Sequence, residues 1–296
     1  MSAAFVPANG IQLCYETFGD RANPPLVLIM GLATQMIVWD DEFCTLLAAR
    51  GFWVVRFDNR DIGMSTRFPK ARTPGLAELM LAQVTRIKFR VPYTLRDMAA
   101  DTVGLMDALN IRRAHVVGAS MGGMIAQELA ILHPARVRSL TSIMSSTGDP
   151  RLPRATPRAL AMLGKKVPLD RDGYVREYVA TWRVLAGEHF PFNFERTARQ
   201  GAAAYDRGIN PPGASRQLLA IIASGNRKKA LRGLKVPTLV IHGTADPLVP
   251  DEHGRDTART VPGARLLLIE GMGHSFPREV WSRIIDAVAA HAEENP

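Results

Sequence analysis

Short apolar runs alternate along this chain of 296 residues with longer segments in which apolar residues recur every three or four positions. Runs of the first kind predict buried strands, and segments of the second kind predict helices with one buried face. Their alternation is typical of an α/β fold, in which helices cover both faces of a mainly parallel, doubly wound sheet. The predicted strands are residues 11–18, 26–29, 52–57, 114–118, 137–144, 236–241 and 265–269, and the helices predicted among them are residues 36–49, 94–109 and 121–132.

The pattern changes between residues 146 and 233. This part is rich in Arg, Pro and Ala and holds no convincing buried strand, but it shows helical periodicity. An all-helical insertion between two strands of a sheet is typical of a cap laid over the strand ends. We therefore expect an α/β core made of residues 1–145 and 234–296, with residues 146–233 inserted as a helical cap. The cap helices are expected near residues 159–163, 174–185, 194–205 and 215–224, and another helix is expected within residues 67–92.

The sequence Gly118-Ala119-Ser120-Met121-Gly122-Gly123 directly follows one of the predicted strands. A strand that stops at Gly-x-Ser-x-Gly and turns at once into a helix places the serine on a strained turn, with its hydroxyl above the edge of the sheet. The helix N-terminus behind it favours negative charge. Glycines on both sides keep side chains away from the neighbouring strand and helix. We therefore predict that Ser120 is a nucleophile.

A serine hydroxyl is a poor nucleophile unless a base takes its proton and a third group orients the base. Asp246 and His274 are the candidates, because each lies in a loop that follows a predicted strand, where active sites of open α/β sheets collect. The chain order Ser, Asp, His is the one expected for this fold. Asp149, which follows another strand, is the alternative acid, although its neighbours Gly148 and Pro150 favour an ordinary turn.

With Gly-x-Ser-x-Gly at 118–122, Gly-x-x-Asp-Pro at 243–247 and Gly-x-Gly-His at 271–274, the chain resembles an α/β-hydrolase along essentially its whole length. Through Met30-Gly31-Leu32 and residues 56–65, it is most similar to bacterial serine esterases of the aclacinomycin methylesterase type. The resemblance implies hydrolysis of a small-molecule carboxylic ester through an acyl-enzyme, with no cofactor and no metal. It also implies that the polar loop 58–61 is architectural.

Family members commonly carry His-Gly after the third strand of their sheet, where a backbone N–H helps to bind the oxyanion. At the corresponding place here, after the predicted strand 26–29, the chain reads Met30-Gly31-Leu32. Since the donor is a backbone group, we predict that the amides of Leu32 and Met121 form the oxyanion hole. Aromatic side chains of the cap could line an acyl or aromatic pocket or pack within the cap. The candidate pocket residues are Met30, Trp39, Trp182, Phe190, Phe192 and Tyr205.

The net charge of +9 lies entirely in residues 146–233, which hold sixteen Lys and Arg against seven Asp and Glu. These cations are scattered and lack the aromatic-plus-basic motifs of nucleic-acid modules, so we interpret them as a solvated surface and expect no nucleic-acid partner. Guidance of anionic substrates is the alternative interpretation. Cys14 and Cys44 are interpreted as core residues. No histidine pair has the helix-face spacing of a metal site.

No apolar run approaches a membrane span, and the first residues lack the pattern of a signal peptide, so a cytoplasmic protein is expected. The sequence leaves open whether the chain forms a homo-oligomer. The same three residues would also support lactone hydrolysis, C–C bond hydrolysis or cofactor-free perhydrolysis, since these differ in pocket shape rather than in the nucleophile. A ligand receptor without catalysis is a more remote alternative.

Overall fold

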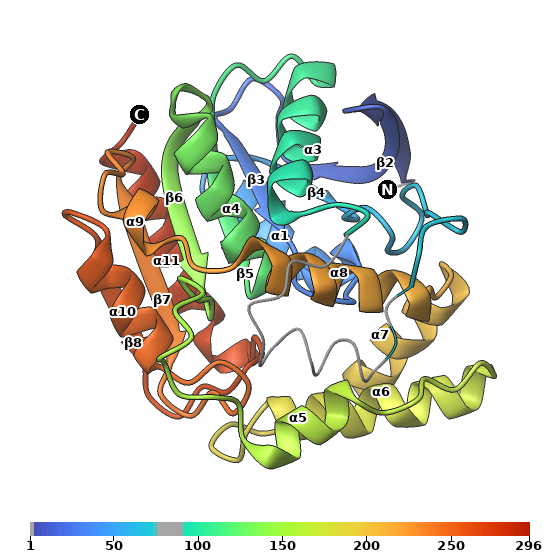
Figure 1. The fold of residues 1–296 in the computed structure, drawn as a ribbon. Coiled ribbons are helices and arrows are strands. Elements are labelled where there is room, and N and C mark those ends of the chain that lie inside the picture. The colour runs from blue at the N-terminus through green and yellow to red at the C-terminus, as the bar shows by residue number, and fades with distance from the viewer. Residues whose placement is uncertain (1–2, 74, 76–90) are drawn as a thin grey trace.

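An eight-stranded sheet with helices on both faces forms the frame of the molecule (Figure 1). The computed structural model describes residues 3–73, 75 and 91–296. The strands follow the order β1-β2-β4-β3-β5-β6-β7-β8; β2 runs antiparallel to its two neighbours, and the other neighbouring pairs are parallel. The predicted mainly parallel sheet is confirmed. The strands are β1 (Ala4–Ala8), β2 (Ile11–Phe18), β3 (Pro25–Ile29), β4 (Trp53–Phe57), β5 (Ala114–Ala119), β6 (Val137–Ile143), β7 (Thr238–Gly243) and β8 (Arg265–Ile269).

Helices α3 and α4 pack on one face of the sheet, and α1 and α11 pack on the other (Figure 1). On β3, Val27 and Ile29 join the apolar cluster on the first face, whereas Leu26 and Leu28 join the cluster on the second. This alternation is the two-residue period of a strand that is buried on both sides. Among the described residues, the helices outside the segment between β6 and β7 are α1 (Asp41–Ala48), α3 (Leu95–Ala108), α4 (Met121–Leu132), α10 (Glu252–Thr260) and α11 (Trp281–Glu293), with short 3-10 turns η1 (Met36–Val38), η2 (Pro134–Arg136) and η3 (Arg278–Val280).

The prediction for the N-terminal part of the chain needs two corrections. The helix expected over residues 36–49 is split into η1 and α1, because Asp40 caps α1 by accepting a hydrogen bond of 2.9 Å from the backbone N–H of Glu42. A short acidic side chain favours such a capping position over a helix interior. Strand β1 is not among the predicted strands, and it contains Pro7, which is tolerated here because β1 lies at the edge of the sheet.

Between β6 and β7 the chain is mostly helical, and its helices up to residue 206 lie beyond one end of the sheet, in the lower part of Figure 1. All four helical stretches expected in this part are confirmed as helices. The division into a core and a cap remains a prediction. Most of the helix expected within residues 67–92 lies outside the described residues. The helices of this part are α5 (Pro157–Leu163), α6 (Arg171–Leu185), α7 (Phe194–Asp206), α8 (Pro211–Ser224) and the short α9 (Lys228–Leu231).

The carboxyl ends of β3 and β5 mark the point in the sheet from which the chain connections run to opposite sides. Both β4 and β5 pair with β3, on opposite sides of it. Ligands of open α/β sheets bind at such a switch point. The loop after β3 begins at Met30 and the turn after β5 holds Ser120, and because Ile29 pairs with Gly118 the two segments leave the sheet side by side.

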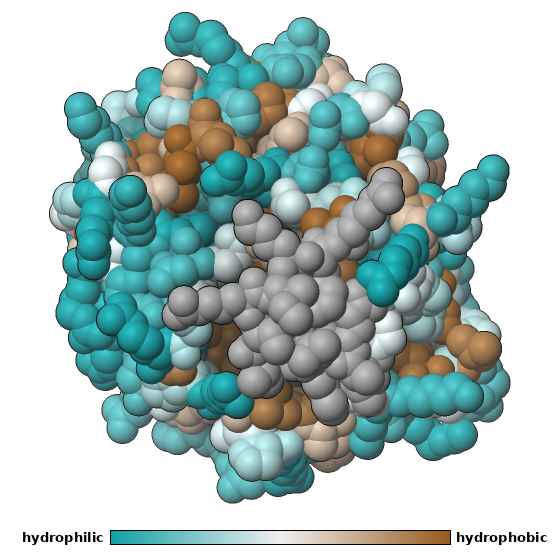
Figure 2. All heavy atoms as spheres, viewed as in Figure 1, coloured by the Kyte–Doolittle hydropathy of each residue, from teal (hydrophilic) through white to brown (hydrophobic). Residues whose placement is uncertain are grey.

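The surface seen in Figure 2 is rich in hydrophilic side chains over the part formed by α10. This helix has nine residues, and seven of them are polar or charged. Within the part of the chain that the structure describes, no helix combines the length and the apolar character that crossing a bilayer requires.

Both cysteines lie in the core, as predicted. Cys14 and Cys44 are fully buried and free. Burial raises the pKa of the Cys14 thiol to about 11 and that of Cys44 to about 12. Both therefore stay protonated at neutral pH, and a thiolate is what nucleophilic or metal-binding chemistry requires.

A buried histidine in β5 should make stability depend on pH. His115 is 3% exposed, and burial, aided by Arg138, lowers its pKa from 6.5 to about 4. The stabilisation from the neutral, buried ring is therefore fully present above pH 6.5. The free energy of unfolding falls as the pH is lowered from 6.5 toward 4, because only the unfolded chain takes up the proton in that interval. We expect wild type to lose about 2 kcal/mol more than a His115→Gln variant over this range, allowing for solvent screening. Urea unfolding of both proteins at several pH values measures the difference, and parallel curves would contradict it.

Candidate active site

Ser120 occupies a strained turn between β5 and α4. Its backbone has φ 55° and ψ −119°, a left-handed value that is rare for a residue with a side chain. The flanking glycines make the turn possible, because a Cβ on Gly118 would lie 2.2 Å from the carbonyl oxygen of Gly122, and one on Gly122 would lie 2.0 Å from that of Ile29. The turn thus exposes the hydroxyl at the point where strand and helix meet.

The structure brings Ser120, Asp246 and His274 together, although they are far apart in the sequence. Nε2 of His274 lies 3.0 Å from Oγ of Ser120, and Nδ1 lies 2.7 Å from Oδ2 of Asp246. When Nδ1–H donates to the carboxylate, Nε2 is left as the acceptor for the serine hydroxyl. This is the arrangement in which an imidazole can take a proton from the hydroxyl.

Two loops hold the carboxylate and the imidazole in place. The backbone N–H groups of Leu248 and Val249 donate to Oδ1 of Asp246 at 2.9 and 2.8 Å, which leaves Oδ2 for the histidine. The backbone N–H of His274 donates to the carbonyl of Leu185, the last residue of α6, at 2.7 Å. Helix α6 therefore helps to fix the loop that carries His274.

Another buried histidine, His242, lies behind the carboxylate. Its Nε2 is 2.7 Å from the carbonyl oxygen of Val249, to which it donates, and 3.7 Å from Oδ2 of Asp246. Burial lowers its pKa, so the ring is neutral near pH 7. His242 thus supports the loop that follows Asp246, and the sequence analysis does not single it out because a histidine at the end of a strand carries no local signal.

The alternative acid, Asp149, is engaged elsewhere. It accepts hydrogen bonds from Arg151 at 2.7 and 3.0 Å and from Lys228 at 3.1 Å. The hydrogen bonds from Arg151 hold the pKa of this carboxyl well below its usual range. Its oxygens are thus committed to cations, while Asp246 is the carboxylate in contact with His274.

The two predicted oxyanion donors lie on segments next to Ser120. Met121 is the first residue of α4, where backbone N–H groups have no partner within the helix. Leu32 lies on the loop after β3, in which a Cβ on Gly31 would be 3.6 Å from Oγ of Ser120. Asn59 holds this loop by donating to the carbonyl of Met30 at 2.8 Å. The role of both amides remains a prediction.

Most of the predicted pocket residues make contacts within the apolar core or within the helices between β6 and β7. Met30 and Trp39 are buried in one core cluster, and the Trp39 ring lies 4.9 Å from that of Phe276. Tyr205 packs on Tyr174 and donates to the carbonyl of Leu169. The role of these three residues in a pocket remains a prediction, and so does that of Trp182, Phe190 and Phe192. Trp182 packs on Tyr178, Phe190 on His189 and the core cluster, and Phe192 on Phe194.

Two ion pairs join the loop after β4 to α8 and to Arg207, the residue that directly follows α7. Asp58 accepts a hydrogen bond from Arg207, and Asp61 binds Arg216 through two hydrogen bonds of 2.8 and 2.7 Å. Both aspartates are completely buried. The prediction that this loop is architectural agrees with these contacts, but the arginine partners are not predicted. The interpretation of the cations of residues 146–233 as solvated is wrong for Arg216 and Arg227, which are 1% and 4% exposed.

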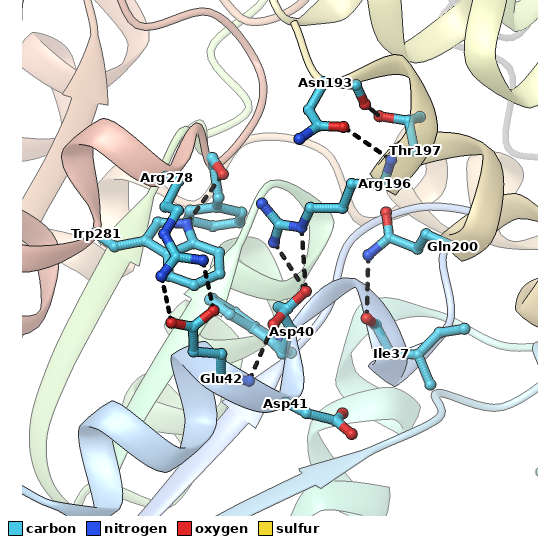
Figure 3. Close-up of polar contacts among 12 residues, drawn as sticks. Ile37, Asp40, Asp41, Glu42, Asn193, Arg196, Thr197, Gln200, Arg278 and Trp281 are labelled. Atoms are coloured by element: carbon cyan, nitrogen blue, oxygen red, sulfur yellow. Dashed lines mark hydrogen bonds and ion pairs between the residues drawn. The ribbon is translucent and has the colours of Figure 1, made fainter. Parts of the chain in front are cut away.

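The start of α7 is also held against the core, around Asp40 (Figure 3). Arg196 donates to Asp40 at 2.9 and 3.2 Å, and its guanidinium lies 4.6 Å from the ring centre of Trp281. One turn later along α7, Gln200 donates to the carbonyl of Ile37 at 3.1 Å (Figure 3). Helix α7 is thus tied to η1 and to the residue that caps α1.

Comparisons with known proteins agree with this architecture. Residues 24–277 match the model of a family described as the alpha/beta hydrolase fold. The rhodomycin D methylesterases DauP of Streptomyces sp. (strain C5) and DnrP of Streptomyces peucetius are each 31% identical to this chain over 312 residues, with 98% of both chains covered. The solved meta-cleavage product hydrolase CumD of Pseudomonas fluorescens IP01 superposes with a TM-score of 0.79 at 20% identity, covering 99% of this chain and 98% of that one, which shows a common fold.

Proposed function

The chain belongs to the α/β-hydrolase fold family, and on this basis we propose that it is a serine hydrolase that cleaves carboxylic esters through an acyl-enzyme. The observation that carries the proposal is the hydrogen-bonded series Ser120–His274–Asp246, with the serine on its strained turn. The methylesterase relatives support the bond type: the chain is a carboxylic ester hydrolase, and a methyl ester is the first substrate to test.

In the first half of the reaction, Oγ of Ser120 attacks the ester carbonyl while Nε2 of His274 takes the hydroxyl proton. The carbonyl oxygen becomes an oxyanion, which we assign to the backbone N–H groups of Leu32 and Met121. The C–O bond to the alcohol then breaks, and the imidazolium returns its proton to the departing alkoxide. Asp246 keeps the imidazole in the tautomer with Nδ1–H and stabilises its positive form.

In the second half, a water molecule attacks the acyl carbonyl while His274 again takes a proton. The bond to Ser120 breaks, the hydroxyl recovers the proton, and the carboxylic acid leaves. Groups of this chain, the substrate and water therefore account for every bond that forms or breaks and for every proton that is transferred. None of the contacts described above favours lactone or C–C bond cleavage over this reaction, so the ester reaction is the one proposed.

Covalent trapping tests the nucleophile directly. A fluorophosphonate is expected to label the wild-type protein once, and peptide mass spectrometry is expected to place the phosphonyl group on Ser120. Preincubation with a methyl ester that turns over should slow the labelling, because ester and probe compete for one site. Labelling at another residue, or labelling that survives in a His274→Ala variant at the wild-type rate, would contradict the proposed route.

A further inference from the structure

We propose that Gln217, on α8, is a positioning residue for the oxyanion hole, acting on the loop that carries Leu32. The inference rests on the proposed function, since it concerns the same reaction. Gln217 is completely buried, and its Oε1 accepts a hydrogen bond of 2.9 Å from the backbone N–H of Ala33. The two residues are 184 positions apart in the sequence. A helix from the segment between β6 and β7 therefore holds the residue next to the predicted donor.

The backbone at Ala33 needs such support. Its φ is 58°, in the left-handed region that residues with a Cβ seldom adopt. A strained backbone angle persists only where the surroundings determine it, and such angles gather at functional sites. The hydrogen bond from Ala33 to Gln217 fixes the peptide that follows Leu32. It therefore limits the rotation of Leu32 and the direction of its N–H.

Both the oxygen and the nitrogen of the Gln217 side-chain amide form hydrogen bonds. While Oε1 accepts from Ala33, Nε2 donates to the carbonyl of Arg60 at 2.9 Å. The carbonyl of Arg60 belongs to the loop after β4, which is itself held to α8 by the Asp61–Arg216 ion pair. Only a group with one donor and one acceptor satisfies both partners. A glutamate at 217 would bring a carboxylate oxygen against a carbonyl oxygen, so the pattern demands an amide.

A second contact orients the same loop from the other side. Oγ1 of Thr34 donates to the carbonyl of Gly31 at 3.0 Å. That carbonyl and the N–H of Leu32 belong to one peptide group, in which they point in opposite directions. Fixing the carbonyl therefore fixes the N–H, and the hydrogen bond also polarises it as a donor. Gln217 and Thr34 together hold the two peptides that flank Leu32.

A comparison of two glutamines tests the proposal. We expect Gln217→Met to lower kcat for a p-nitrophenyl ester by about 10- to 100-fold, with KM changed by less than about twofold, since the donor acts on the transition state. The affinity for a trifluoromethyl ketone, whose oxygen becomes an oxyanion when Ser120 adds to it, should fall by a similar factor. The control is Gln200→Met, on α7, which likewise removes two side-chain hydrogen bonds, one to the carbonyl of Ile37 and one from the hydroxyl of Tyr178, and should leave kcat within about twofold of wild type.

Two variants of Thr34 test the positioning role independently if Gln217→Met fails to fold. We expect Thr34→Val to lower kcat by about fivefold or more, and Thr34→Ser, which keeps the hydroxyl, to stay within about twofold of wild type. The pH profile of kcat/KM should keep its wild-type inflection in all variants, because His274 and Asp246 are untouched.

The failures of the inference and of the proposed function look different. Wild-type turnover with Ser120 labelled, but with Gln217→Met no slower than Gln200→Met, or with Thr34→Val unchanged, would overturn the positioning role alone. A fall in kcat without a matching fall in ketone affinity would do the same. A wild-type protein that hydrolyses no ester and is not labelled at Ser120 would overturn the proposed function, and the positioning role with it.

Discussion

Replacement of Ser120 by alanine is expected to lower kcat for carboxylic esters by at least about 10⁴-fold, because no other group of the site can form the acyl-enzyme. The hydroxyl removed is the one 3.0 Å from Nε2 of His274. Alanine keeps the Cβ in the turn, so the free energy of unfolding should change little. Steady-state kinetics with a p-nitrophenyl ester measures the loss, and thermal unfolding verifies the fold.

The control for this variant is a serine with no part in the site. Ser282 is exposed on α11, and Ser282→Ala is expected to retain wild-type kcat. Activity of Ser120→Ala above about a hundredth of wild type would mean that water attacks the ester without a covalent intermediate. The residual rate also reports on the oxyanion donors and on substrate binding, since these survive the substitution.

The nucleophile and its partners can be predicted from the sequence because their signals are local. Ser120 lies in a motif five residues long, and the strand before it and the helix after it are predicted from the apolar pattern. Asp246 and His274 each follow a strand that is a short apolar run. Parallel strands bring their carboxyl ends to one edge of the sheet, so knowledge of the strands is enough to place the three residues near each other.

The contacts that hold the site together cannot be predicted in this way, because they join segments far apart in the sequence. Asp61 and Arg216 are 155 positions apart, and Gln217 lies 157 positions from its partner Arg60. The sequence holds 37 basic and 28 acidic residues, so opposite charge alone does not identify which of them form ion pairs. The charge excess of residues 146–233 therefore predicts a solvated surface, although Arg216 is among the largest fully buried side chains of the protein.

The helix boundaries in the first part of the chain also depend on contacts that the sequence pattern does not predict. Residues 36–49 have a helical period of apolar positions, but the structure divides them at Asp40. The carboxylate of Asp40 both caps α1 and binds Arg196 of α7. Periodicity predicts which residues are buried, whereas the break depends on a cap and on a partner that periodicity does not register.

Removal of the Arg216 guanidinium is expected to destabilise the protein by about 3–5 kcal/mol, because the Asp61 carboxylate would remain buried without a cation. Burial alone would raise the pKa of Asp61, but its hydrogen bonds from Arg216, Phe68 and Tyr93 outweigh burial and lower the pKa below its usual value. In Arg216→Met the apolar stem of the side chain is largely kept, so the loss reflects the charge, its two hydrogen bonds to Asp61 and a third, from Nη1 to Oγ1 of Thr73. Urea unfolding at neutral pH measures it.

The chain provides a control in which an arginine binds an aspartate in the same two-bond geometry, but in an exposed pair. Arg171 binds Asp206 through Nε and Nη2, both at 2.8 Å, just as Arg216 binds Asp61 at 2.8 and 2.7 Å. The first pair is about half exposed, whereas the side chains of the second are 2% and 0% exposed. Solvent and salt screen an exposed pair, so Arg171→Met should change the stability little. Equal losses in Arg171→Met and Arg216→Met would refute the role assigned to burial.

A second substitution separates the ion pair from the packing around it. If an unpaired buried carboxylate is the main cost in Arg216→Met, then adding Asp61→Asn should recover part of the lost stability, because the amide is neutral. The stability of the double variant should then exceed that of Arg216→Met alone. If it were instead the sum of two separate losses, the pair would be uncoupled, and α8 would be held to the core by Gln217 and by apolar contacts rather than by charge.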